Sequence, residues 1–236
     1  MQKILLTTTF LTVFHLVQAQ LTVQGDSLIN LGKYQLQLSK QGFPEQIDSL
    51  LAENVHFHFF RVSDGKDIRL TSDGVHFTRR DRGNVEWNVT NASDELRMEV
   101  VASLRADGHL SYKVTVTALQ DLDIKDITMH IPFQPEKAKE MKGLGLKGGA
   151  RPDSNYRWKW ETGQKTPAGV WIKTGKEGLT YFLEPGAWNN EGKGGIIVGI
   201  KGKSMLVNNY SGPRHLLKGD SLHFNFDLAA MSGKGK

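Results

Sequence analysis

Segments in which apolar and polar residues alternate recur along most of the chain, and turns that contain glycine separate many of them. The two clearest segments are 95–105 and 110–118, with Asp107-Gly108 between them. Alternation puts every second side chain on one face of a strand, and Asp-Gly between two alternating runs favours a tight hairpin. The same criteria predict further strands at 21–23, 28–31, 34–39, 55–62, 68–70, 75–78, 84–91 and 222–228.

Helical periodicity is almost absent from the chain. Only 44–52 and 135–141 could form helical turns, and both segments are short. Many short strands with very little helix are typical of an all-β, antiparallel β-sandwich, in which each sheet buries one face. Because no Pro/Ser-rich linker divides the chain, we predict one β-sandwich domain over 20–228 and a flexible tail at 229–236.

The N-terminal residues follow a different pattern. Lys3 precedes an apolar run at 4–17 that ends in Val17-Gln18-Ala19, which is the pattern of a signal peptide cut after Ala19. The run is shorter than the roughly 20 apolar residues that a membrane-spanning helix needs. We therefore predict a signal peptide at 1–19, export to the periplasm or the cell exterior, and no membrane span.

Composition and charge exclude several classes of function. The 236 residues contain no cysteine, so disulfides and zinc-thiolate sites are impossible. The net charge is +5, and the densest basic cluster, Arg79-Arg80-Asp81-Arg82, falls at the expected tip of a hairpin. A nucleic-acid surface needs a continuous basic stripe interleaved with aromatic residues. Since the chain has no such stripe, we predict no nucleic-acid partner.

Two histidines are candidates for metal binding. His56 and His58 lie two residues apart in a predicted strand, so both imidazoles face the same side. The spacing identifies no third ligand. The alternative interpretation is a pair of partly buried or surface histidines, and we predict neither a metal site nor a cofactor.

The sequence singles out no catalytic group. A pair of carboxylates is the signature of glycoside hydrolysis, and Asp153, Glu161, Glu184 and Glu191 lie in the glycine-rich second half. Their spacing distinguishes no acid and no base. The motifs of zinc proteases, P-loop proteins and serine hydrolases are also absent, so we assign no catalytic residue.

The second half of the chain is rich in glycine and tryptophan. From Gly143 onward there are 18 of the 25 glycines, and four of the five tryptophans lie between 151 and 190. Alternate aromatic residues on a strand share one face, which suits stacking against sugar rings. The alternative roles are core packing and contact with another domain. The candidates for carbohydrate binding or a domain interface are Tyr156, Trp158, Trp160, Trp171 and Trp188, with Arg151 and Asn189 as polar neighbours.

Several strings resemble a known family when they are taken together and in order. They are KQGFPE at 40–45, MKGLGLKGG at 141–149, Arg151-Pro152, YRWKW at 156–160, GVWI at 169–172 and WNNEGKGG at 188–195. These strings resemble the N-terminal domain that precedes the catalytic barrel in proteins similar to glycoside hydrolase family 123, which are common in Bacteroidetes.

This resemblance implies a β-sandwich, in agreement with the alternation pattern. Family members hydrolyse N-acetylgalactosaminides with an adjacent Asp-Glu pair in a downstream barrel. Segment 222–228 resembles the last strand before that barrel, and the printed chain ends at residue 236. A barrel of this kind usually needs about 250 residues, so no catalytic residue of the family can be carried over.

The resemblance therefore implies a non-catalytic module. Its expected role is to bind carbohydrate or to support a catalytic barrel that is separately encoded or missing. Its expected partners are glycans or a separately encoded catalytic barrel. The alternatives are a small self-sufficient glycoside hydrolase with an unidentified carboxylate pair and a truncated, inactive fragment.

Overall fold

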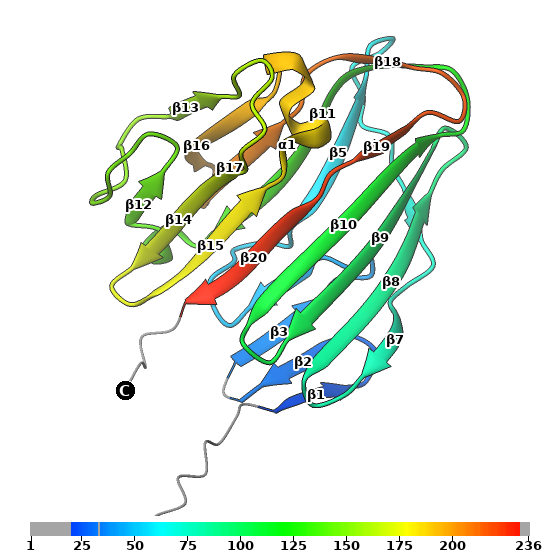
Figure 1. Cartoon of the computed structure of the whole chain (residues 1–236). Helices are drawn as coiled ribbons and strands as arrows, with labels where there is room; N and C mark the ends of the chain where they lie inside the picture. Colours follow the sequence, from blue (N-terminus) through cyan, green and yellow to red (C-terminus); the bar gives the residue numbers. More distant parts are fainter. Residues whose placement is uncertain (1–19, 33, 232–236) are drawn as a thin grey trace, which may run out of the picture.

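The computed structural model describes residues 20–32 and 34–231, and these residues form three sheets of antiparallel strands (Figure 1). The first sheet has the order β1 (Leu21–Gln24), β2 (Leu28–Leu31), β3 (Tyr34–Leu38) and β4 (Pro44–Ile47). The largest sheet has the order β12 (Glu140–Gly143), β14 (Ala168–Thr174), β15 (Glu177–Leu183), β20 (Phe226–Met231), β10 (His109–Ala118), β9 (Leu96–Arg105), β8 (Asn84–Ala92) and β6 (Thr71–Ser72). In that sheet β19 (Ser221–His223) also pairs with β10, and β7 (His76–Arg80) pairs with β8.

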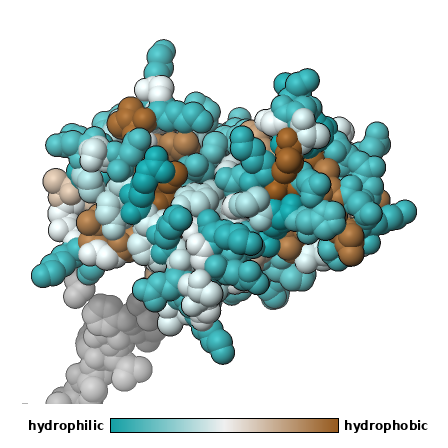
Figure 2. All heavy atoms as spheres, turned by 90° about the horizontal axis from the view of Figure 1, so that it is seen from above, coloured by the Kyte–Doolittle hydropathy of each residue, from teal (hydrophilic) through white to brown (hydrophobic). Residues whose placement is uncertain are grey.

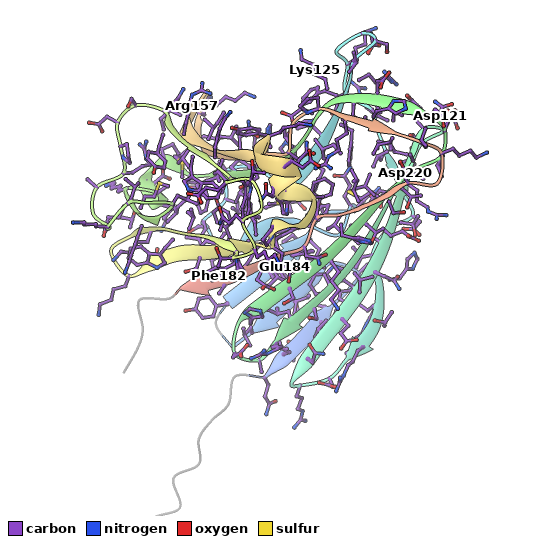
Figure 3. All side chains as sticks on the ribbon, turned by 45° about the horizontal axis from the view of Figure 1, so that its top comes forward. Asp121, Lys125, Arg157, Phe182, Glu184 and Asp220 are labelled. Carbon is purple, nitrogen blue, oxygen red and sulfur yellow. The ribbon has the colours of Figure 1, made fainter. Side chains whose placement is uncertain are left out.

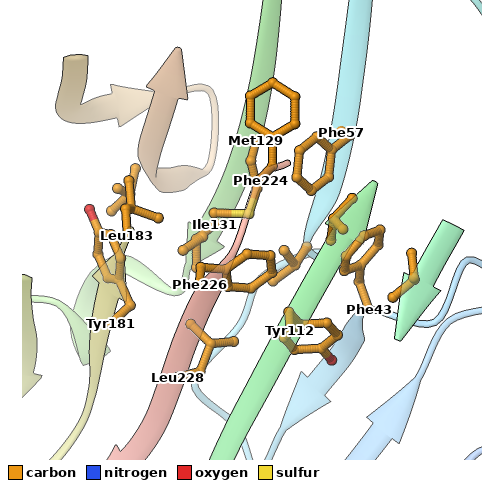
Figure 4. Packing of buried hydrophobic residues seen from close by; sticks show 14 of the residues in the cluster. Phe43, Phe57, Tyr112, Met129, Ile131, Tyr181, Leu183, Phe224, Phe226 and Leu228 are labelled. Carbon is orange, nitrogen blue, oxygen red and sulfur yellow. The ribbon is translucent and has the colours of Figure 1, made fainter. Parts of the chain in front are cut away.

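The third sheet lies across the core from the largest one. Its order is β13 (Tyr156–Lys159), β16 (Gly195–Lys201), β17 (Ser204–Tyr210), β11 (Leu122–Phe133) and β18 (Arg214–Leu216), and β5 (His56–Arg61) pairs along β11. Aromatic and aliphatic side chains from facing strands fill the space between the sheets (Figure 4). The predicted all-β, antiparallel sandwich is confirmed.

All but one of the segments predicted from alternation contain a strand, but the criterion missed β4, β6, β11, β12 and β14–β18. The long hairpin is β9 and β10, whose side chains alternate between buried and more exposed positions over ten residues each. The basic cluster lies at the turn between β7 and β8, as predicted. Segment 68–70 is not a strand, because the chain there meets β5 only through the single bridge of Asp67 to Phe60.

The strand β11 escaped the alternation criterion. Its first half alternates, but every residue from Ile127 to Phe133 is buried. A strand that is covered on both faces has no polar side to reveal its period. This strand contributes to the histidine cluster described below.

The helical predictions were partly wrong. Segment 44–52 contains β4 instead of a helical turn, because Pro44 and Ile47 are buried and the segment pairs with β3. Segment 135–141 does begin with a short 3-10 helix, Pro135–Lys137. The structure adds a helix, α1 (Pro185–Asn189), and a 3-10 turn, Asn190–Gly192, that the pattern did not predict.

The boundary of the predicted tail also changes. Strand β20 continues to Met231 and pairs with β15 up to that residue, so 229–231 belong to the sheet. Residues 232–236 and the predicted signal peptide at 1–19 lie outside the described residues. In the described ranges, no helix has the length and apolar character needed to cross a membrane.

The face of the molecule that is seen from above is mostly hydrophilic (Figure 2). In the view from above, hydrophobic side chains form separate patches among hydrophilic ones (Figure 2). The exposed large hydrophobic residues of the described part are Val62, Val101, Phe182, Ile200 and Leu217. Scattered exposed aliphatic residues are normal for a folded domain, but an exposed aromatic side chain is a candidate for binding.

One short loop joins the sheets at the core. The carbonyl of Gly42 accepts hydrogen bonds from Trp87 Nε1 at 3.0 Å and from the hydroxyl of Tyr112 at 3.3 Å. The next residue, Phe43, is fully buried, and its ring centroid lies 5.3 Å from that of Phe57 and 5.5 Å from that of Tyr112. Side chains from the largest sheet and from the third sheet therefore both pack against this loop.

Substitution at Gly42 tests this role. Gly42 has φ of +87°, and a Cβ there would lie 2.6 Å from Val89 Cγ2. We expect Gly42→Ala to lower the free energy of unfolding by about 2–4 kcal/mol, because backbone strain and overpacking add. Gly25→Ala is the control, since Gly25 has φ of +61° and open space around it, and should cost only about 1–2 kcal/mol. Equal losses in urea unfolding would contradict the packing argument.

Candidate functional site

The predicted aromatic row on β13 faces the interior of the sandwich. Tyr156 and Trp158 are half-buried and pack against the core, and Trp160 is buried. The rings of Trp158 and Trp160 lie 5.0 Å apart at 68°, and the hydroxyl of Tyr156 donates to the carbonyl of Leu144. The alternation was read correctly, but its shared face is the inner one. Binding of a sugar by these three rings stays a prediction.

Trp188 and Trp171 lie in opposite environments. Trp188, in α1, is fully buried, and its ring packs 4.7 Å from that of Phe224 and 5.8 Å from that of Phe57. This position matches the core alternative. Trp171, in β14, is half-buried on the outer face of the largest sheet, where Lys173 Nζ lies 4.3 Å from its ring centroid.

The two polar candidates support loops. Arg151 donates to the carbonyls of Ala138, at 3.1 Å, and Pro152, at 2.8 Å. Asn189 is buried; its Nδ2 donates to the carbonyl of Glu161 at 3.0 Å. Both side chains donate hydrogen bonds to backbone carbonyls, and these bonds hold the glycine-rich loops in place.

The outer face of the largest sheet combines aromatic and polar groups. Phe182 of β15 is 45% exposed and pairs with Gly169 of β14. In the other direction it pairs with Asp227 of β20, which in turn pairs with Ser111 of β10. Ser111 Oγ donates to Asp227 Oδ1 at 2.5 Å, and His109 Nε2 lies 3.3 Å from the same oxygen.

We call this set the outer aromatic face: Trp171, Phe182, Asp227, Ser111 and His109. The register places Trp171 opposite Thr180, two residues before Phe182 on the same face. Diagonal neighbours across strands are within reach of aromatic side chains. The face therefore offers two rings beside a hydrogen-bonded polar group.

A second group lies on the outer face of the third sheet. His56 and His58 come from β5, and His130 comes from β11, where it pairs opposite His56. The ring centroids are 4.7 Å apart for His56 and His58, 5.0 Å for His56 and His130, and 4.7 Å for His58 and His130. We call these three residues the histidine cluster.

The cluster has specific electrostatic surroundings. Desolvation, together with the neighbouring histidines and Lys201, lowers the pKa of His130 to about 3. Burial likewise lowers the pKa of His56, against the effect of its hydrogen bond to the Asn54 carbonyl. Both rings are therefore neutral at neutral pH, and a neutral imidazole has a lone pair for a ligand.

The cluster includes a residue that sequence reasoning missed. Spacing correctly placed His56 and His58 on one face, but His130 lies on β11, which the alternation pattern did not detect. The sequence signal that could have identified His130 was its place as a histidine in the largely apolar run from Ile127 to Phe133. In the described part of the chain, these are the residues grouped closely enough to supply three nitrogen or carboxylate ligands to one metal ion.

The four carboxylates considered for hydrolysis are all exposed: Asp153, Glu161, Glu184 and Glu191. They lie in the loops before and after β13, at the start of α1 and in the 3-10 turn after it. Glu184 accepts a hydrogen bond from Asn225 Nδ2 at 2.8 Å. The structure therefore adds no reason to choose an acid and base pair among them.

Comparison with known protein families gives a match. The sequence model described as glycoside hydrolase 123, third domain, matches residues 21–185 and 180–230. A search of curated proteins finds no match. The family match agrees with the family named by the sequence strings, but it concerns a third domain and does not confirm an N-terminal position.

Solved structures share the fold at low sequence identity. A provisionally assigned aldose 1-epimerase from Escherichia coli K12 has a TM-score of 0.51 and 12% identity, covering 91% of this chain and 99% of the other. A provisionally assigned mutarotase from Salmonella typhimurium has a TM-score of 0.50 and 9% identity, covering 92% of this chain and 95% of the other. These similarities establish a shared β-sandwich architecture.

Two tryptophan substitutions test the assigned environments. We expect Trp188→Ala to reduce the free energy of unfolding by about 3–5 kcal/mol, because it empties a core position. Trp171→Ala should cost well under half of that, since its ring is half-buried on an outer face. Urea unfolding monitored by circular dichroism gives both values, and Trp188→Phe serves if Trp188→Ala does not fold. A larger cost at Trp171 than at Trp188 would refute the placement.

Proposed function

Because the chain belongs to the glycoside hydrolase 123 family, matching its third-domain model, we propose that it is a carbohydrate-binding module that uses the outer aromatic face. The observation that carries the proposal is the exposed ring of Phe182, which lies beside a hydrogen-bonded polar group on a domain of carbohydrate-related ancestry. Figure 3 shows Phe182 on the opposite side of the molecule from Arg157.

The chemistry of this face suits a pyranose ring. Sugars present apolar C–H faces, which pack on aromatic rings, and hydroxyl groups at their edges, which need donors and acceptors. Phe182 supplies a ring, while Asp227 supplies an acceptor and His109 a group that can donate or accept. Few precisely positioned polar groups around an aromatic surface are a common feature of small-ligand sites.

The glycine that pairs with Phe182 leaves room for its ring. A Cβ at Gly169 would lie 2.6 Å from Phe182 Cε1 and 2.8 Å from Cδ1, so the edge of the ring lies close to the glycine. A larger residue at 169 would displace this ring.

The proposed ligands are glycans that contain N-acetylgalactosamine, the sugar class that the sequence resemblance implies. In this proposal the module holds such glycans for a catalytic barrel and performs no hydrolysis itself. A test with chromogenic N-acetylgalactosaminides addresses this part separately. Release of chromophore by the pure protein would contradict the non-catalytic role without affecting glycan binding.

The proposed setting is outside the cytoplasm. The sequence pattern at 1–19 supports export with cleavage after Ala19. N-terminal sequencing of the protein recovered from the periplasm or medium should begin at Gln20. Recovery only in the cytoplasm with the leader retained would contradict export.

Substitutions on the outer aromatic face test glycan binding. We expect Phe182→Leu and Trp171→Ala each to weaken binding of N-acetylgalactosamine oligosaccharides roughly two- to tenfold, the effect of one lost aromatic contact. Isothermal titration calorimetry measures the affinity, and tryptophan fluorescence monitors it for variants that retain Trp171. Leu217→Ala, which changes an exposed apolar residue elsewhere, should leave the affinity unchanged. Absence of binding across a panel of such glycans would refute the proposal.

A further inference from the structure

The hydrogen bonds of the histidine cluster determine which ring nitrogens are free. Nδ1 of His56 lies 2.8 Å from the carbonyl oxygen of Asn54, which can only accept, so this nitrogen carries the proton. Nδ1 of His58 lies 2.6 Å from Asp67 Oδ2. An imidazole that binds a metal ion while its Nδ1 carries a proton must do so through Nε2, so Nε2 is the available ligand atom of both residues. The contacts of the two Nδ1 atoms therefore determine that the Nε2 atoms of His56 and His58 are the possible metal ligands.

Asp67 fixes the ring of His58. The Asp67 carboxylate accepts hydrogen bonds from His58 Nδ1 at 2.6 Å and from the Phe59 backbone N–H at 2.8 Å. A carboxylate that orients a ligating histidine in this way is the usual second partner in zinc sites.

The spacing of the three rings suits one metal ion. The possible ligand nitrogens of His56, His58 and His130 all lie within 4.8 Å of one another. Tetrahedral zinc with Zn–N bonds of about 2.0–2.1 Å needs nitrogens about 3.3 Å apart. Closing the site from the observed spacing requires each nitrogen to move by less than about 1 Å, which side-chain rotation can provide.

Two buried oxygens beside the cluster have no partner. Thr128 pairs opposite His58, and Asn208 pairs opposite His130 on the same outer face. Within the described residues, Thr128 Oγ1 and Asn208 Oδ1 are buried and form no hydrogen bond. Buried polar atoms without partners are uncommon and call for a bound water or ligand. These two unpartnered oxygens are a second observation, separate from the distances between the histidine rings.

The surrounding charges are mixed. Asp67 and Glu53 contribute negative potential near His56, whereas Lys201 contributes positive potential near His130. A divalent cation is favoured by the two acids and opposed by the one lysine.

We propose that His56, His58 and His130 bind one divalent transition metal ion, preferably Zn²⁺, with Asp67 as the carboxylate that orients His58. Three imidazole ligands leave a fourth position for water or another oxygen ligand, as in open zinc sites. A water there would give Thr128 and Asn208 a hydrogen-bond partner. The site lies on the third sheet and is separate from the outer aromatic face, so each can exist without the other.

Metal titration of the purified protein tests the proposal. After treatment with a chelator, calorimetric titration with zinc sulfate should give one ion per chain, and thermal unfolding should shift upward with zinc because the ion binds only the folded site. Titration with Co²⁺ should produce the visible absorption of a tetrahedral complex. Absence of stoichiometric binding by both ions would overturn the proposal.

Variants locate the ion within the protein. His56→Ala, His58→Ala and His130→Gln should each weaken zinc binding at least about 100-fold, and Asp67→Asn should weaken it about 10- to 100-fold. His215→Ala is the matched control, because His215 Nδ1 also lies 2.7 Å from a carboxylate, that of Asp123, but belongs to no cluster. That variant should retain the affinity.

The remaining outcomes are also decisive. Far-UV circular dichroism without metal shows whether each variant is folded, and His58→Gln replaces any alanine variant that is not. Equal loss of binding in His215→Ala, or full binding in folded His56 and His58 variants, would show that zinc binds elsewhere and would overturn the proposal.

Discussion

The packing of Gly42 and Phe43 is the contact on which the three-sheet arrangement depends. The Gly42 carbonyl accepts from Trp87 and Tyr112, and the Phe43 ring lies between aromatic residues of the largest and third sheets. The chain has no cysteine that could cross-link these sheets. Their relative position therefore depends on shape complementarity in the core, and a side chain at residue 42 would push the loop away from β8.

Close approach of backbone segments explains the surplus of glycine in the second half. A Cβ at Gly143 would lie 2.2 Å from the carbonyl oxygen of Gly169, and one at Gly194 would lie 1.8 Å from that of Trp188. Glycine is the residue that permits such contacts. Two tryptophans of the same region, Trp160 and Trp188, are buried in the core, whereas Trp171 lies on an outer face.

The sandwich presents two outer faces with different chemistry. The face of the largest sheet has exposed and half-buried rings beside Asp227, while the face of the third sheet has the histidine cluster. Strands expose alternate residues, so a face can change its chemistry while the buried residues between them keep the fold. This separation allows the glycan proposal and the metal proposal to succeed or fail independently.

The sequence by itself determined the fold class, the strands of the first half of the chain except β4 and β6, and the shared face of His56 and His58. These features follow from local periodicity and turn residues, as in the hairpin of β9 and β10. It could not decide which face of β13 is buried, because alternation is the same whichever side meets the core. It could not bring His130 to His56 either, since that contact depends on pairing between β5 and β11, and the two histidines are more than seventy residues apart in the chain. Only tertiary structure decides such pairings, because they follow from how whole sheets bury their surfaces.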